Sequence, residues 1–383
     1  MSSTSKIDST VLVETFVSKL KRRQITGSYQ VALETCHLLM RVISSSRWNA
    51  PDEFIKLIRS VGSTLVRAQP REFSAGNIVR RVLAMIRDEV NETHSNLPSS
   101  SNNENALNSA PVNTSMFQLL STDSTSKTNA MVNNNTNHSN TNNTQQVTSI
   151  PLTTSASLKA HNQDLRSVVI QGIRELIDEI VSVHENIELM TVDLIHDNEV
   201  LLTPTPGSTT VLNFLLKASL KRKFTVLVTE SYPNDIEKAH VFAKTLAEAN
   251  IETVIIPDST VFAVMSRVGK VLIGARSVFA NGGCVTAAGV ATVCECAKEH
   301  RTPVFTVAGL YKLSPTYPFD RDNLIEVGNS GKVIPYEDND LMGKCEVSNP
   351  LYDYVIPEHI DIYITNMYVF FSYIFFYRMI QVY

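Results

Sequence analysis

Residues Thr253 to Pro318 read TVIIPDSTVFAVMSRVGKVLIGARSVFANGGCVTAAGVATVCECAKEHRTPVFTVAGLYKLSPTYP, and this stretch decides the fold. Short β-branched runs alternate in it with segments of helical spacing, which predicts two or three βα units in succession. The predicted strands are 254–256, 270–274, 277–280 and 303–308, and the predicted helices are Ser259–Met265 and Val285–His300. Strands without polar alternation, placed between helices, are typical of a parallel sheet buried on both faces.

The same pattern extends upstream. Strands are predicted at Glu199–Thr203 and Phe224–Thr229, followed by helices at Ser208–Leu220 and Asp235–Asn250. Ligands of such sheets lie beyond the carboxyl ends of the strands, so we expect the loops at Asp258, at 281–283 and after Ala308 to share one functional rim. Neither GxGxxG nor a Walker loop occurs, and no nucleotide or other cofactor is expected.

Composition divides the rest of the chain. Helical spacing from Val11 to Val90 predicts a bundle of about four helices, and Asp164–Ile195 predicts one long connecting helix. Asn, Ser and Thr dominate between them, and so polar a segment is expected to be disordered. The predicted fold class is therefore α/β: a helical domain (1–90), a disordered insert (91–162), a connecting helix (163–197), a Rossmann-like sheet domain (198–366) and an aberrant tail (367–383).

Charge and cysteine usage restrict the setting. The net charge of −4, from 34 Lys and Arg against 38 Asp and Glu, gives no basic field for direct binding of nucleic acid. The short basic run at 21–23 is interpreted as a solvated helix end. Among the five cysteines, Cys294 and Cys296 lie in a predicted helix with no second CxxC or His pair at zinc spacing, which favours buried thiols over a metal site. The amino terminus does not resemble a signal peptide, which favours a reducing, cytosolic location.

Several strings carry a resemblance to a known family. They include FAVMSRV at 262–268, KVLIG at 270–274, ANGG at 280–283, YKLSP at 311–315, IHDNE at 195–199 and LLMR at 38–41. The chain thereby resembles the regulatory subunits (alpha, beta and delta) of eukaryotic translation initiation factor 2B, and among them the beta subunits. The resemblance covers most of the chain outside the insert and the tail.

The sheet domain also resembles the related isomerases of methylthioribose-1-phosphate and ribose-1,5-bisphosphate. Where those enzymes have a Cys, an Arg and an Asp, this chain has Thr205, Tyr232 and Arg276. A hydroxyl or a guanidinium is a poor acid or base near neutral pH, and a phenol does not neutralise a phosphate. We therefore expect a vestigial pocket rim without catalytic residues; its members are Thr205, Ser208, Glu230, Tyr232, Arg276 and Asn281. Ser208 is suited to capping a helix or to holding an anion, and capping is favoured.

The resemblance implies a non-catalytic subunit of the guanine-nucleotide exchange complex for initiation factor 2. Implied partners are the alpha, gamma, delta and epsilon subunits, delta especially, together with the alpha subunit of initiation factor 2; neither nucleic acid nor a membrane is an expected partner. His196 and Asp197 are candidate interface residues. The alternatives are an active sugar-phosphate isomerase and a free-standing scaffold.

The carboxyl end departs from the family after Asn366. An apolar, aromatic-rich run replaces the expected last strand, loop and helix, and it is shorter than the roughly 20 residues of a spanning helix. We interpret residues 367–383 as non-native sequence, from an unspliced intron or a frame error.

Overall fold

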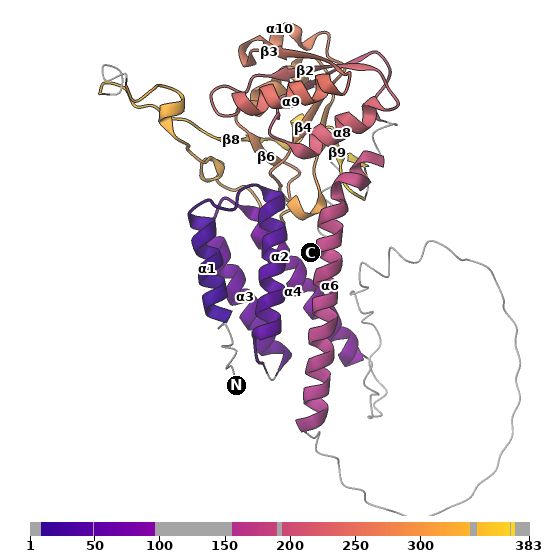
Figure 1. The fold of residues 1–383 in the computed structure, drawn as a ribbon, viewed down its shortest axis with the longest axis vertical. Helices are drawn as coiled ribbons and strands as arrows, with labels where there is room; N and C mark the ends of the chain where they lie inside the picture. The colour runs from indigo at the N-terminus through magenta and orange to yellow at the C-terminus, as the bar shows by residue number, and fades with distance from the viewer. Residues whose placement is uncertain are drawn as a thin grey trace, which may run out of the picture.

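The computed structural model describes residues 9–48, 50–95, 155–189, 194–337, 343–367 and 369–371. Figure 1 shows a helical bundle at one end and a sheet domain at the other, joined along one side by the long helix α6. Most of the predicted insert, and the tail beyond residue 371, lie outside the described residues. None of the described helices combines the length and hydropathy that a bilayer-spanning helix needs.

Four helices form the bundle. They are α1 (Ser9–Lys21), α2 (Ser28–Ser45), α3 (Pro51–Ala68) and α4 (Phe73–Ser95). Pro51 stands in the first turn of α3 with Asp52 and Glu53, where a missing N–H costs nothing and negative charge is favoured. Gly27 precedes α2 with a φ of 88°, a conformation that favours glycine. The predicted helical stripes face inward, and Leu39, Ile58 and Ile78 are fully buried.

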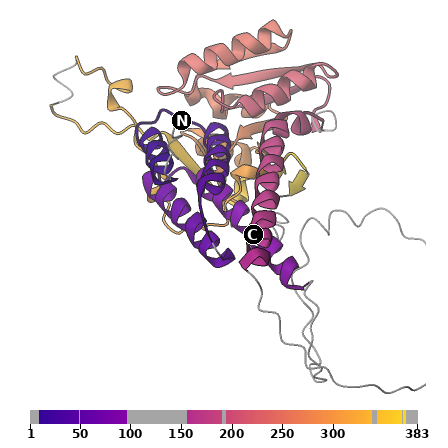
Figure 2. The same ribbon diagram turned by 60° about the horizontal axis from the view of Figure 1, so that its bottom comes forward.

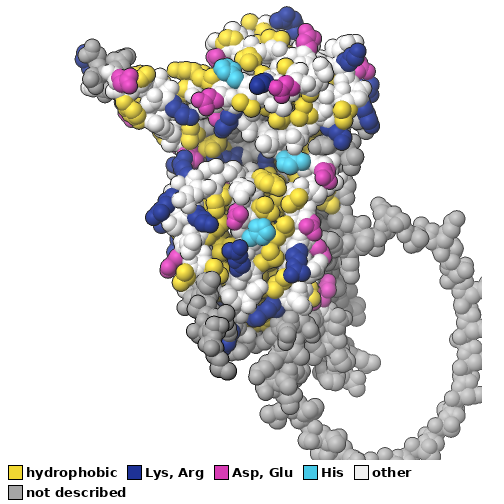
Figure 3. Space-filling view, in the orientation of Figure 1, with side chains coloured by type: hydrophobic (Ala, Val, Ile, Leu, Met, Phe, Trp, Pro, Cys, Tyr) yellow, Lys and Arg dark blue, Asp and Glu magenta, His cyan; other side chains and the backbone are white. Residues whose placement is uncertain are grey.

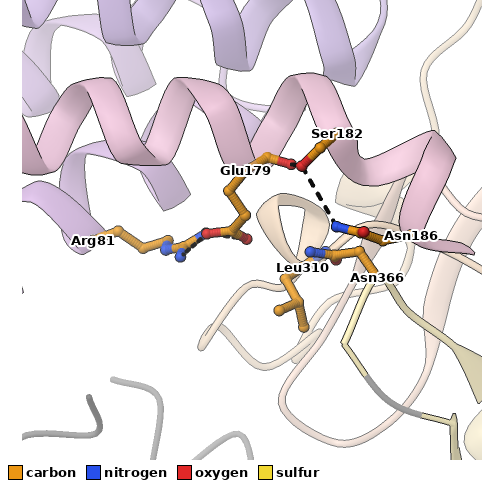
Figure 4. Close-up of polar contacts among 6 residues, drawn as sticks. All are labelled: Arg81, Glu179, Ser182, Asn186, Leu310 and Asn366. Atoms are coloured by element: carbon orange, nitrogen blue, oxygen red, sulfur yellow. Dashed lines mark hydrogen bonds and ion pairs between the residues drawn. The ribbon is translucent and has the colours of Figure 1, made fainter. Parts of the chain in front are cut away.

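Helix α6 (Ser155–Leu189) connects the two parts. It packs against α2 and α4 in the bundle and against α8 (Thr209–Ser219) in the sheet domain. Arg81 on α4 donates to both carboxylate oxygens of Glu179 on α6, at 3.2 and 2.6 Å (Figure 4). In a view that brings the bundle forward, α6 again runs from the bundle to the sheet (Figure 2). The connecting helix predicted from sequence is therefore packed over both parts.

A seven-stranded sheet in the order β10-β9-β7-β4-β1-β2-β3 forms the centre of the second part. Six strands are parallel, and β10 pairs antiparallel with β9. Leu201 of β1 contributes to the core under α8 and α9, and the next residue, Leu202, to the core under α10 and α11. This alternation buries both faces of the sheet. The strands are β1 (Glu199–Thr203), β2 (Phe224–Thr229), β3 (Glu252–Ile256), β4 (Lys270–Gly274), β7 (Val304–Val307), β9 (Ile362–Ile364) and β10 (Val369–Phe371), and the remaining α-helices are α9 (Ile236–Glu248), α10 (Val261–Met265) and α11 (Val290–Glu299).

Three expectations for the central stretch differ from the structure. The helix predicted to begin at Val285 does not begin there, because Cys284–Ala287 is a strand that pairs with a segment almost seventy residues further along the chain. The run predicted as a main-sheet strand at 277–280 is reduced to Ser277–Val278 in the same small antiparallel sheet. That sheet consists of β5 (Ser277–Val278), β6 (Cys284–Ala287) and β8 (Tyr352–Val355). Strand β3 lies at the edge of the sheet and is not buried on both faces as predicted, since Val254 and Ile255 are each 43% exposed.

Short 3-10 turns complete the loops around the sheet. They are η1 (Asp258–Thr260), η2 (Leu310–Lys312), η3 (Asp322–Leu324), η4 (Ser330–Lys332) and η5 (Pro357–His359). In η2, the backbone N–H of Leu310 donates to Oδ1 of Asn366 at 3.0 Å (Figure 4). The side chain of Asn366 is thus bound to the loop that follows β7.

Candidate functional site

A cavity of about 460 Å³ lies where the bundle meets the carboxyl ends of β1 and β4. Residues 26–30, at the start of α2, line it from the bundle. From the sheet domain it is lined by Thr205, Gly207, Ser208, Thr209, Thr210, Asp235, Lys238, Gly274, Ala275, Arg276, Thr286, Ala287, Tyr311, Lys312 and Tyr352. This is the place at which parallel sheets usually bind ligands, so we take it as the candidate site.

Hydroxyl groups hold the sheet side of the cavity together. Thr205 is buried, and its Oγ1 accepts from the backbone N–H of Gly274 at 3.0 Å, which joins the loop after β1 to the end of β4. Ser208 is the N-cap of α8, and its Oγ accepts from the N–H of Val211 at 3.3 Å. A Cβ on Gly274 would lie 2.4 Å from that Oγ, so a side chain does not fit there. Both hydroxyls are therefore used in structural contacts.

Arg276 is paired within the protein. Its Nη2 donates to Oε2 of Glu72 at 2.9 Å, and its Nη1 lies 3.8 Å from Oε2 of Glu326. Its guanidinium carbon lies 4.1 Å from the centroid of the Tyr352 ring, within the range of a cation–π contact. Glu72 precedes α4 and its side chain is buried. The positive charge of Arg276 consequently neutralises a carboxylate from the bundle side of the cavity.

Lys312 is a second buried cation at the site. Its Nζ lies 5.7 Å from the centroid of the Tyr311 ring. Burial lowers the pKa of Lys312 to about 8, and the carboxylate of Glu72 opposes that shift. An amine with a pKa near neutral is able to accept a proton, but isomerisation also needs a matching acid. The carboxylate that lines the cavity, Asp235, is already paired with Lys238 at 2.8 Å.

Three of the six predicted rim residues line the cavity, namely Thr205, Ser208 and Arg276. Tyr232 is more than half exposed and its hydroxyl donates to the carbonyl of Val333 at 3.3 Å. Asn281 lies in the turn between β5 and β6, and its Nδ2 donates to the Tyr354 hydroxyl at 2.6 Å. Glu230 follows β2 and is half-buried. These three residues do not line the cavity.

The two candidate interface residues lie at the opposite end of the sheet, before β1. His196 is exposed, and its backbone N–H donates to Oε2 of Glu199 at 3.0 Å. The carboxylate of Asp197 accepts from the backbone N–H of Lys223 and from Nη1 of Arg222, each at 3.0 Å. These hydrogen bonds, that from Lys223 foremost, lower the pKa of Asp197. Asp197 thus ties β1 to the loop before β2.

Three residues of the site escaped the sequence analysis: Glu72, Lys312 and Tyr352. Glu72 comes from a loop some 130 residues before the first strand, and nothing in its local sequence indicates a partner. Lys312 is a single charge within the apolar run 304–313, and such a charge is a usable signal of a buried cation. No group of three or more His, Cys, Asp or Glu side chains suited to a metal ion occurs among the residues described.

Proteins of known family match this chain over most of its length. A sequence model described as the Initiation factor 2 subunit family matches residues 24–370. The chain is 38% identical over 371 residues to translation initiation factor eIF2B subunit beta of Schizosaccharomyces pombe, which covers 93% of this chain and 91% of that protein. The corresponding protein of Dictyostelium discoideum is 35% identical over 359 residues, covering 92% and 90%.

A solved structure resembles the whole chain. A chain of the tetrameric eIF2B-beta2-delta2 complex from C. thermophilum matches with a TM-score of 0.67 and 26% identity, covering 97% of this chain and 94% of that one. Ribose 1,5-bisphosphate isomerase of Pyrococcus furiosus is 30% identical over 205 residues, covering 53% of this chain and 63% of that enzyme. The similarity to the isomerase is therefore confined to about half of the chain.

Proposed function

The chain belongs to the Initiation factor 2 subunit family, as a regulatory subunit of beta type and not as an isomerase, and from this premise we propose its place in the exchange complex. It pairs with a delta-type subunit and assembles with alpha, gamma and epsilon subunits. In that complex it contacts the alpha subunit of initiation factor 2 and relays the phosphorylation state of that subunit to control initiation. Nucleotide exchange itself takes place on another subunit.

One observation carries this proposal: the 38% identity to a beta subunit extends over 93% of the chain, whereas similarity to the isomerase covers 53%. The cavity supports the same conclusion. Arg276 stands where the resemblance to the isomerases places an acidic catalytic residue, and it is paired with Glu72 at 2.9 Å. Because Arg276 is paired with Glu72, its charge is better suited to holding the bundle against the sheet domain than to acting on a substrate.

Purification of the tagged full-length chain from its own cells tests the assembly. We expect the four other subunits to co-purify, and the preparation to accelerate release of GDP from initiation factor 2, less so when the alpha subunit of that factor is phosphorylated. Recovery of the chain without the other subunits would favour the free-standing scaffold. The proposed location is the cytosol, where initiation takes place.

The isomerase alternative has its own test. The purified chain is incubated with ribose 1,5-bisphosphate, and the ketose product is measured beside an authentic isomerase. We expect no ketose above the rate without protein, because the lining residues include no free acid to complement Lys312. Turnover would restore the enzymatic interpretation.

His196 and Asp197 remain proposed interface residues. Replacing His196 with Ala removes an exposed imidazole ring. The hydrogen bond to Glu199 is kept, because the backbone N–H of residue 196 donates it. We expect weaker co-purification with the delta-type subunit at unchanged melting temperature. Asp197→Asn is the companion variant, since it keeps the size of a side chain that ties two loops together. Unchanged co-purification of both variants would remove these residues from the interface.

A further inference from the structure

A projecting arm of the sheet domain leads from η3 to β8. Its described residues are 327–337 and 343–350. Figure 1 shows the arm extending sideways from the sheet domain, and Figure 3 shows it standing clear of the body with hydrophobic side chains among its exposed atoms. A segment that projects in this way buries little of its own surface against the rest of the chain.

The base of the arm is built by specific polar contacts. Asn349 is buried, and its Nδ2 donates to Oδ1 of Asn234 at 2.9 Å and to the carbonyl of Asn329 at 2.8 Å. Lys332 Nζ donates to the carbonyl of Asn234 at 3.0 Å. The backbone N–H of Gly328 donates to the carbonyl of Asn349 at 2.7 Å. These bonds fix where the arm leaves the domain, next to the loop that follows β2.

Tyr232 supports the arm from that same loop. This residue occupies the position at which the related isomerases have an arginine, but its side chain lies outside the cavity. Its hydroxyl donates to the carbonyl of Val333 on the arm at 3.3 Å, and 58% of its surface remains exposed. The tyrosine at this position therefore contacts the arm and not the cavity.

The exposed side chains of the arm indicate the kind of partner. Val327 and Tyr336 of the arm are 58% and 59% exposed, and Tyr232, which contacts the arm at Val333, is 58% exposed. Such groups are favoured at the centres of protein interfaces. In the sequence the arm, residues 327–350, has two cations, Lys332 and Lys344, against the four acids Glu337, Asp338, Asp340 and Glu346. The lack of excess positive charge disfavours nucleic acid and anionic membranes, which both require such an excess.

We propose that the arm, together with Tyr232, docks on the sheet domain of the paired delta-type subunit. The inference rests on the proposed function, because the matching structure is a beta2-delta2 tetramer and the arm belongs to the domain proposed to pair. The partner surface offers apolar side chains to Val327, Tyr336 and Tyr232. The excess of acids in the arm sequence disfavours a strongly acidic partner face.

Cys345 provides a direct probe of the docking. It lies on the arm and is exposed, whereas Cys36, Cys284 and Cys294 are buried and Cys296 is half-buried with a pKa raised by burial. We expect a maleimide to label Cys345 of the free chain rapidly, and at least tenfold more slowly once the chain is saturated with its cognate delta-type subunit. Cys345→Ser should abolish the rapid phase and thereby identify it.

Two variants test the energetics of the same surface. Val327→Asp and, separately, Tyr336→Ser are each expected to weaken the affinity for the delta-type subunit at least tenfold at unchanged melting temperature. Leu220→Asp is the matched control, because Leu220 is 74% exposed and directly follows α8. In Figure 1 the helix α8 lies on the side of the sheet domain opposite the arm. This control should bind as the native chain does.

These experiments distinguish failure of the arm assignment from failure of the proposed function. If the complex forms while Cys345 stays reactive and both variants bind normally, the arm is not the interface and the proposed function stands. If the native chain does not bind the delta-type subunit at all, both the arm assignment and the proposed pairing fall. Protection of Cys345 on concentrating the chain alone would assign the arm to a second copy and overturn the proposal.

Discussion

Lys312 is enclosed beside Tyr311 and near the carboxylate of Glu72, at the junction between the bundle and the sheet. Its burial places the pKa at about 8 in the folded state, below the value of 10.5 expected for the unfolded chain. Between these two values the unfolded chain binds more protons than the folded one. Lys312 therefore opposes folding most strongly below pH 8, and its opposition fades as the pH rises.

This linkage gives a prediction at the scale of one residue. The free energy of unfolding of the native chain, minus that of Lys312→Met, should rise by about 2 kcal/mol between pH 8 and pH 10. Urea denaturation of both proteins across that range measures the difference, and taking the difference cancels the titration of shared tyrosines and cysteines. A difference that is constant with pH would show that Lys312 is solvated in the folded protein.

Helix α8 and strand β4 approach closely at the site. Gly274 ends β4, and a Cβ added there would lie 2.4 Å from Oγ and 2.7 Å from Cβ of Ser208, the N-cap of α8. The loop after β1 completes the contact, since Thr205 accepts from the Gly274 N–H at 3.0 Å. The first turn of α8 is thus able to lie this close to β4 because Gly274 has no side chain.

A double-mutant cycle tests this packing at the scale of elements. Gly274→Ala should lower the free energy of unfolding by about 1–3 kcal/mol, because Ser208 must move to admit the methyl group. Ser208→Gly removes the clashing atoms at a cost of a few tenths of a kcal/mol in capping. The two changes together should therefore be less destabilising than their sum by about 1 kcal/mol or more.

Gly207→Ala is the control for this cycle. Its added Cβ would meet chiefly the flexible side chains of Asp235 and Lys238, at 3.3 and 3.5 Å. It should change stability by less than about 1 kcal/mol and show no coupling to Ser208→Gly. Additive effects of Gly274→Ala and Ser208→Gly would contradict the packing argument.

Two ion pairs link the bundle to the sheet domain at the scale of the whole molecule. Arg276 of the sheet domain holds Glu72 of the bundle, whose side chain is 2% exposed, at 2.9 Å. Arg23, which follows α1 and is more than half exposed, is paired with the buried Glu326, which also lies 3.8 Å from Arg276. The orientation of the two parts therefore depends in part on one ion pair, Arg276 with Glu72, that is mostly removed from water.

Arg276→Met should disturb this junction. It leaves Glu72 buried without its principal partner, and a broken buried pair typically costs about 3–5 kcal/mol. We expect that loss in urea denaturation, together with faster amide exchange in residues 26–30 and little change in β1 and β2. Arg222→Met is the control, because its pair with Asp197 is far more exposed and a pair screened by water contributes little to stability. Equal losses of unfolding free energy in both variants would show that the pair of Arg276 with Glu72 contributes no more than an exposed ion pair.

The sequence predicted most of the sheet domain because its signals are local. β-branched runs bounded by turns located β1, β2, β3, β4 and β7 to within about two residues, and Ser208 was recognised as a cap from its own neighbourhood. Helix α11 was predicted five residues too early, since the pairing of Cys284–Ala287 with Tyr352–Val355 is a long-range contact that no local pattern reports. Residues 284–287 therefore form a strand, although the spacing of their apolar residues is helical.

By itself, then, the sequence determined the class of fold and the family, and a resemblance to the isomerases predicted that three of their functional residues are replaced by Thr205, Tyr232 and Arg276. The tertiary structure alone decided what those three side chains contact. Thr205 and Arg276 face the cavity and hold neighbouring segments, whereas Tyr232 leaves it and supports a projecting arm. The physical reason is that local patterns record the propensity of a segment, but the partner of a buried charge, such as Glu72 for Arg276, depends on chain segments about two hundred residues apart.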